Sequence, residues 1–272
     1  MNQLILRGLS GGLFLALVIF CTLYSEITFF ALFYIFMVLC LYEFSEITKS
    51  NKFFAFCIGS IVFLIGNLEI SELLSFKIES KYLTSLSLLL VFGAFIVSLF
   101  SSNRHQSIEK LGKLFTNIIY VAIPFTLLGR IPFLGQVFED GKTLVLGVFI
   151  LIWVSDTFAF FTGKLIGKHK LFENVSPGKT IEGLIGGTLF TLLAAIVLAK
   201  QFNVCSLHQW VFISLIVVIF GVLGDLIESM FKRQCKQKDS SSLFPGHGGF
   251  LDRLDSIIFT APFLYIYLEL IH

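Results

Sequence analysis

Long apolar runs separated by short polar stretches dominate this 272-residue chain. Nine of the runs have about the length that an α-helix needs to cross a bilayer, which is roughly 17–25 residues. They lie at residues 8–24, 27–44, 53–70, 82–101, 112–129, 142–162, 181–199, 209–227 and 255–271. Pro124 is expected to kink the fifth helix, which is the least distinct. The pattern therefore predicts an all-α polytopic membrane protein with about nine transmembrane helices.

The composition agrees with this class. Hydrophobic residues make up 56% of the chain and charged residues only 14%, which is not the balance of a soluble domain. The five cysteines are scattered and show no CxxC pair, so we expect reduced, apolar side chains. Polar residues suited to chemistry gather after Trp153. We therefore expect a single integrated membrane domain, with scaffold helices in residues 1–140 and the catalytic region in residues 141–272.

The distribution of lysine and arginine predicts the orientation of these helices. If the N-terminus is cytoplasmic, the cytoplasmic segments hold 15 of these residues and the outer segments hold 5. Cytoplasmic segments of membrane proteins have such an excess of positive charge. This orientation places the polar segments after the sixth and eighth helices in the cytoplasm, and the odd number of helices leaves the C-terminus outside.

Acidic and basic residues are concentrated between Gly224 and Ser256. Asp225 and Glu228 are three residues apart at the end of one apolar run, so they share a helix face, and Asp252 and Asp255 open the next run with the same spacing. If the loop folds these two helix ends together, their carboxylates form a site of the kind that Mg²⁺ prefers. The intervening lysines and arginines suit phosphate. A solvated charged loop is the alternative, but acids at a membrane boundary are costly and usually functional.

A second polar region begins with Asp156, about two turns inside the sixth predicted helix. An acid there is expected to face a wet cavity or the bundle interior, or to pair with another helix. Further along, Pro177 and the neighbouring hydroxyls predict a helix start. Lys179 would then lie in the first helical turn, where free N–H groups and the helix dipole attract anions, unless it only snorkels beside a cap. Glu182 is either a first-turn acid or a ligand, and the sequence does not separate the two.

Three segments resemble the C-terminal signature of the phosphatidate cytidylyltransferases, also called CDP-diacylglycerol synthases. They read SMFKR at 229–233, KD at 238–239 and FPGHGGFLDRLD at 244–255. The segments SDTFAF at 155–160 and SPGKTIEG at 176–183 also resemble this family, whereas the N-terminal half matches only in character. The resemblance implies conversion of CTP and phosphatidate to CDP-diacylglycerol and pyrophosphate with Mg²⁺, in the plasma (inner) membrane, by a homodimer. No nucleic-acid partner is expected.

The family motif assigns roles to individual residues. It implies that Asp225 and Asp252 are the main metal ligands, and that Asp156, Lys179 and Glu182 belong to the nucleotide and metal site. We add Glu228 to the metal ligands and leave a second cation open. We expect catalytic roles for Asp225, Asp252, Lys179 and Arg253. Substrate contacts are expected from Lys232, Arg233, Lys238, His247, Ser176, Thr180 and Asp255.

Two other functions fit part of the pattern. A CTP-dependent lipid-alcohol kinase has some similar elements, but it would release CDP rather than pyrophosphate. An ether-lipid cytidylyltransferase would carry out the expected reaction on a different lipid substrate. A transporter could use Asp156, Asp225 and Glu228 as a relay. Transporters, however, commonly have internal repeats with polar features in both halves, and here those features lie in one half.

Overall fold

The computed structural model describes residues 3–67, 107–134, 140–237, 240–241 and 248–271, together with Phe92. Two compact units emerge, the first from Met1–Arg130 with Asp239–Arg253, and the second from Ile131–Lys238 with Leu254–His272. The first unit thus includes part of the signature segment, and the expected division at residue 140 stays a prediction. Apart from Phe92, the predicted fourth helix lies outside the described residues.

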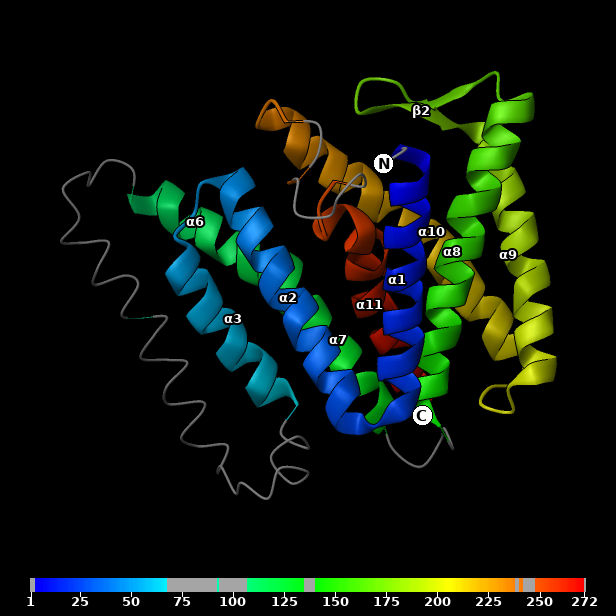
Figure 1. The fold of residues 1–272 in the computed structure, drawn as a ribbon, viewed down its shortest axis with the longest axis horizontal. Helices are drawn as coiled ribbons and strands as arrows, with labels where there is room; N and C mark the ends of the chain where they lie inside the picture. The colour runs from blue at the N-terminus through cyan, green and yellow to red at the C-terminus, as the bar shows by residue number, and fades with distance from the viewer. Residues whose placement is uncertain are drawn as a thin grey trace. The chain divides into compact units, whose positions relative to one another are not determined.

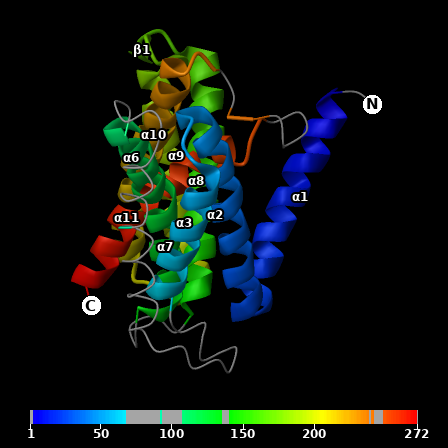
Figure 2. The same cartoon turned by 90° about the vertical axis from the view of Figure 1, so that its left-hand side faces the viewer.

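The first unit is helical throughout its described N-terminal part (Figure 1). Its elements are α1 (Gln3–Tyr24), α2 (Glu26–Thr48), α3 (Lys52–Gly66), α6 (Ser107–Asn117), the π-helical turn η2 (Ile118–Ala122) and α7 (Ile123–Arg130). A capping box between Ser25 and Thr28 starts α2 right after α1 ends, so the two helices meet at a sharp corner (Figure 2). Asn51 caps α3, which packs against both α2 and α7.

The helix around Pro124 continues instead of breaking. Proline has no N–H to donate to the residue four before it, which here is Tyr120. The preceding residues form the π turn η2, in which the N–H of Ile123 bonds to the carbonyl of Ile118. This wider turn accommodates the proline without breaking the helix. Ile108–Phe133 therefore remains long and apolar enough to cross a membrane.

The second unit is built on three long helices and a hairpin. Its elements are η3 (Ile131–Phe133), α8 (Gly141–Ile166), β1 (Lys170–Phe172), β2 (Ser176–Thr180), α9 (Ile181–Gln201), α10 (Leu207–Gln234) and most of α11 (Leu251–Leu270). Helices α8 and α9 run side by side, with the hairpin beyond one end of the pair (Figure 1). They approach closely because Gly187 has no side chain; a Cβ there would lie 3.0 Å from the Ala159 Cβ.

Five helices in the described residues are long and apolar enough to cross a membrane, by length and composition. They are Glu26–Thr48, Ile108–Phe133, Gly141–Ile166, Ile181–Gln201 and Leu207–Gln234, and two shorter apolar helices are Ser10–Tyr24 and Lys52–Gly66. An all-α membrane protein is therefore confirmed as the class, with one small hairpin added. The count of about nine spans and the orientation of the termini stay predictions.

Candidate active site

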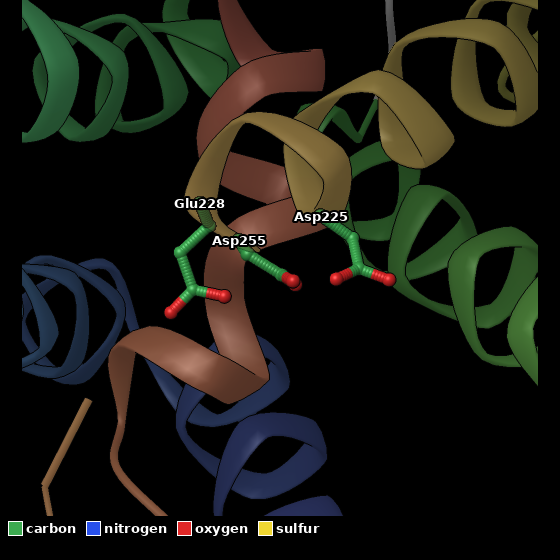
Figure 3. A group of neighbouring side chains, drawn as sticks. All are labelled: Asp225, Glu228 and Asp255. Carbon is green, nitrogen blue, oxygen red and sulfur yellow. The ribbon is translucent and has the colours of Figure 1, made fainter. Parts of the chain in front are cut away.

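Three carboxylates converge in the second unit. Asp225 and Glu228 lie one turn apart on α10, and Asp255 of α11 lies between them (Figure 3). Each offers an oxygen that is within 4.8 Å of the others. Glu228 and Asp255 are buried, with exposed fractions of 1% and 8%. The approach depends on Gly224, because a Cβ there would lie 2.6 Å from the Asp255 carbonyl oxygen.

Two lysines partly neutralise this acid cluster, which we define as Asp225, Glu228 and Asp255. Lys179 forms an ion pair with Asp225. The Nζ atom of Lys232, one turn after Glu228, lies 2.8 Å from the Glu228 Oε2 atom and is nearly as buried. The two lysines thus place positive charge beside two of the three acids, and buried charges are stabilised by such pairing.

Neighbouring groups complete the surroundings of the cluster. The Ser229 hydroxyl donates to Asp225 Oδ1 at 3.2 Å, as their spacing on a helix allows. Asp156 of α8 is close enough to Asp255 for the two negative charges to repel each other. Oxygen ligands are what Mg²⁺ selects, and it usually takes one or two carboxylates together with substrate phosphates. The donor set of the cluster thus fits a divalent cation and a bound phosphate chain.

The position of Lys179 corrects the predicted helix start. Pro177 does not begin a helix; it lies in strand β2, which pairs with β1. Helix α9 begins at Ile181, and the Thr180 side chain caps it by accepting from the Gly183 N–H at 3.1 Å. The fixed φ of proline suits an extended strand as well as a first helical turn, so the pairing with β1 decides. Lys179 therefore reaches Asp225 from strand β2 and not from the first turn of α9.

Two further predicted residues near the hairpin have local partners. Glu182 accepts hydrogen bonds from the backbone N–H groups of Lys168 at 3.0 Å and His169 at 3.2 Å, and its Oε1 lies 2.6 Å from His169 Nδ1. These contacts hold the start of the hairpin against α9. Ser176 lies opposite Phe172 in the β-ladder. A metal-binding role for Glu182 and a substrate contact for Ser176 stay predictions.

Asp252 belongs to the first unit, so its predicted meeting with Asp225 stays a prediction. Its Oδ2 atom accepts from the Ser240 N–H and hydroxyl, both at 3.0 Å, and from the Gly249 N–H at 2.8 Å. Arg253 is exposed beside it. Of the other predicted contacts, Arg233 is also exposed, whereas Lys238 and His247 lie outside the described residues.

One acid that the sequence analysis did not consider also belongs to this region of the first unit. Glu43 of α2 is fully buried and accepts hydrogen bonds from Ser240, Ser241, Phe250 and Leu251. The signal that could have found it is a single acid inside an apolar run, because ionisable residues in a membrane span are rare and usually functional.

Fold and site together define a helical membrane protein that gathers carboxylates and lysines at the end of α10. The chain belongs to the Cytidylyltransferase family, whose model matches residues 5–271. This confirms the family predicted from the motifs.

Curated relatives named phosphatidate cytidylyltransferase resemble the chain. The relative from Staphylococcus saprophyticus is 42% identical over 154 residues, which are 56% of each chain. That from Staphylococcus haemolyticus is 47% identical over 134 residues, or 48% of this chain and 50% of the relative. That from Staphylococcus aureus strain COL is 39% identical over 184 residues, or 66% and 68%. The chain thus spans about half the length of the first two relatives.

Proposed function

We propose that this protein is a phosphatidate cytidylyltransferase, which converts CTP and phosphatidate to CDP-diacylglycerol and pyrophosphate in phospholipid biosynthesis. The observation that supports it most is the acid cluster with its two lysines, Lys179 and Lys232, in a chain of the Cytidylyltransferase family. The names of the curated relatives agree with this activity.

The reaction needs no nucleophile from the protein. A phosphate oxygen of phosphatidate attacks the α-phosphorus of CTP and forms a new P–O bond. The bond between the α-phosphorus and the oxygen that bridges it to the β-phosphate breaks. The electron pair of that bond leaves with pyrophosphate. Phosphoryl-type transfers of this kind depend mostly on positioning and on cations that offset the developing charge. A site of carboxylates and lysines suits that requirement.

The acid cluster would hold Mg²⁺, with Asp252, Asp156 and Glu182 as further predicted ligands. A bound Mg²⁺ supplies charge neutralisation at the phosphate oxygens and at the leaving pyrophosphate. Lys179 is about one quarter exposed, so its ammonium group can turn from Asp225 to a phosphate oxygen when CTP enters. Lys232 is held by Glu228 and would fix a second phosphate. Arg253, Arg233, Lys238 and His247 are proposed as additional phosphate contacts.

The membrane brings the two substrates together. The apolar helices would keep the acyl chains of phosphatidate in the plasma membrane, and CTP would arrive from the cytoplasm. From the uneven distribution of lysine and arginine we propose a cytoplasmic N-terminus, cytoplasmic catalytic loops and a C-terminus on the outer side. A homodimer is proposed from the family resemblance.

The product distinguishes this function from its rivals. Membranes that contain the protein are incubated with phosphatidate and CTP that is labelled in cytosine, with and without Mg²⁺. We expect a labelled, chloroform-soluble nucleotide only with Mg²⁺. Labelled CDP in the aqueous phase would instead indicate the lipid-alcohol kinase. If neither product forms, the proposal is refuted.

Two variants test the metal ligands that the motif implies. Asp225→Asn and Asp252→Asn are each expected to abolish turnover, while membrane fractionation shows normal insertion. Asparagine keeps the size of the side chain but removes the charge that would bind Mg²⁺. If both variants retain the activity of the wild type, the metal assignment is wrong, although the proposed function stands.

A further inference from the structure

Glu43 is a buried acid that the proposed chemistry does not use. It lies on α2 and is 0% exposed. Its Oε2 atom accepts from the Leu251 N–H at 2.8 Å and from the Ser240 hydroxyl at 2.9 Å. Its Oε1 atom accepts from the Phe250 N–H at 3.0 Å and from the Ser241 hydroxyl at 2.6 Å. Each oxygen thus takes one backbone N–H and one hydroxyl, which an acceptor-only carboxylate needs when it is buried.

These partners give the carboxylate two tasks in the first unit. Leu251 is the first residue of α11, and the N–H groups at a helix start have no partner within the helix. Glu43 satisfies the N–H groups of Phe250 and Leu251, and its negative charge suits the positive end of the helix dipole. At the same time it holds Ser240 and Ser241. One side chain from α2 therefore binds the two stretches 240–241 and 250–251 together.

The hydroxyl of Ser240 extends this arrangement to Asp252. It lies 2.9 Å from Glu43 Oε2 and 3.0 Å from Asp252 Oδ2, so one proton is shared between the two carboxylates. The Ser240 and Gly249 N–H groups also donate to Asp252 Oδ2. Asp252 is therefore held in one orientation by groups that Glu43 itself holds in place.

The two consecutive glycines of the signature fit the same arrangement. Gly248 has a φ of 83°, which residues with a side chain rarely adopt. A Cβ at Gly249 would collide with the Ser240 hydroxyl and with Glu43, whose Cδ would be only 2.7 Å away. The backbone at Gly249 thus passes close to the Glu43 carboxylate, and the space beside it has no room for a side chain.

We infer that Glu43 is a positioning residue for Asp252, acting through Ser240 and the start of α11. The inference rests on the proposed function, because it takes Asp252 to be a functional acid. Partners that hold a metal ligand in place commonly change metal affinity or activity by about 10–100-fold when they are mutated. Loss of the Glu43 charge should therefore weaken the site although Glu43 lies outside the acid cluster.

The test uses the purified full-length protein with Glu43→Gln. Glu46→Gln is the matched control, since Glu46 lies one turn further along α2 and is exposed in an ion pair with Lys52. For Glu43→Gln we expect a fall in kcat/KM of about 10-fold or more, and a similar loss of Mn²⁺ affinity by electron paramagnetic resonance without substrates. Hydrogen exchange should accelerate at the amides of residues 249–252 but not in α8 or α9. The control should match the wild type in all three measurements.

Ser240→Ala gives an independent measurement, because it removes the shared hydroxyl and leaves the hydrogen bonds that the Phe250 and Leu251 N–H groups donate to Glu43. It should lower kcat/KM by itself and add little in the Glu43→Gln background, since both act on the same contact. If Glu43→Gln does not fold, the Ser240→Ala variant decides. Wild-type kinetics and Mn²⁺ affinity in the variant that decides would overturn the inference.

The two proposals fail in different ways. If the wild-type protein makes no CDP-diacylglycerol, the proposed function is wrong, and the inference fails with it. If the wild type is active and Asp252→Asn is inactive, but Glu43→Gln behaves like the wild type, only the positioning role is wrong. Faster exchange at 249–252 with unchanged kinetics and Mn²⁺ affinity would also overturn it, because Glu43 would then have a structural role alone.

Discussion

Replacing Asp255 with asparagine should weaken the stabilisation of this protein by divalent cations. The three carboxylates of the acid cluster offer oxygens within 4.8 Å of one another. At that separation, two unit charges repel by about 3.5 kcal/mol at an effective dielectric constant of 20. Asp255 meets such repulsions from Asp225 and Glu228 and a further one from Asp156, but Lys179 and Lys232 bind Asp225 and Glu228 and offset part of the energy.

The net effect without a cation should therefore be small but of defined sign. Asparagine has nearly the same shape as aspartate, and its oxygen can still accept from the Ser256 N–H. In a chelator, Asp255→Asn should stabilise the folded protein by on the order of 1 kcal/mol, because burial and the neighbouring acids both disfavour a charge at this position. With Mn²⁺ at about 100 times its dissociation constant, the wild type should gain about 2.7 kcal/mol, and the variant less because it has lost a ligand.

Thermal unfolding of the purified protein, followed by tryptophan fluorescence in chelator and in Mn²⁺, measures both effects. Glu173→Gln is the control, since it removes one negative charge from an exposed position of the same unit. Asp255→Asn should be more stable than the wild type in chelator and less stable than the wild type in Mn²⁺. An equal response of wild type and variant to Mn²⁺, or a less stable variant in chelator, would refute a cation site at Asp255.

Three other predictions concern the nucleotide, the signature loop and the orientation. Lys179→Ala should raise the KM for CTP or lower kcat/KM, because its ammonium is proposed to bind phosphate; steady-state kinetics with unchanged constants would leave it a structural ion pair. Gly249→Ala should lower the free energy of unfolding by about 1–3 kcal/mol through overcrowding, whereas Gly112→Ala, which meets nothing within 4 Å, should not; chemical denaturation compares them. A membrane-impermeant maleimide should label the exposed Cys235 in inside-out vesicles but not in right-side-out ones, and Cys205 in neither, because burial raises its pKa to about 12; labelling from outside would reverse the orientation.

The apolar pattern located α8 and α9 because a membrane span must be both long and apolar. The run at 142–162 became α8 (Gly141–Ile166), and the run at 181–199 became α9 (Ile181–Gln201). The hairpin between them escaped prediction because β1 and β2 are short and largely exposed, so neither shows the alternation of a half-buried strand. Pairing between two such strands depends on what their neighbours leave open, which a local pattern does not contain.

Spacing along one helix predicted part of the cluster, but not the contacts between helices. Asp225 and Glu228 were expected to share a face because they are three residues apart, and they do. Asp255 was expected to bring a carboxylate to the same place and to contact substrate; the structure places it beside Asp225 and Glu228, and the substrate contact stays a prediction. Spacing cannot reveal which faces of two helices meet; here Gly224 permits the contact, because it leaves room for the α11 backbone.

Glu43 shows most clearly what a motif leaves out. The Ser240 hydroxyl that it binds is 197 residues away in the sequence, and no periodicity joins two such positions. The motif nevertheless has a trace of it: Gly249 must lack a side chain because the Glu43 carboxylate and the Ser240 hydroxyl fill the space beside it. A glycine with no evident turn function therefore indicates that another group approaches its backbone. Helix α2, taken from the sequence as scaffold, supplies that group, so the chemistry of the signature cannot be understood from residues 141–272 alone.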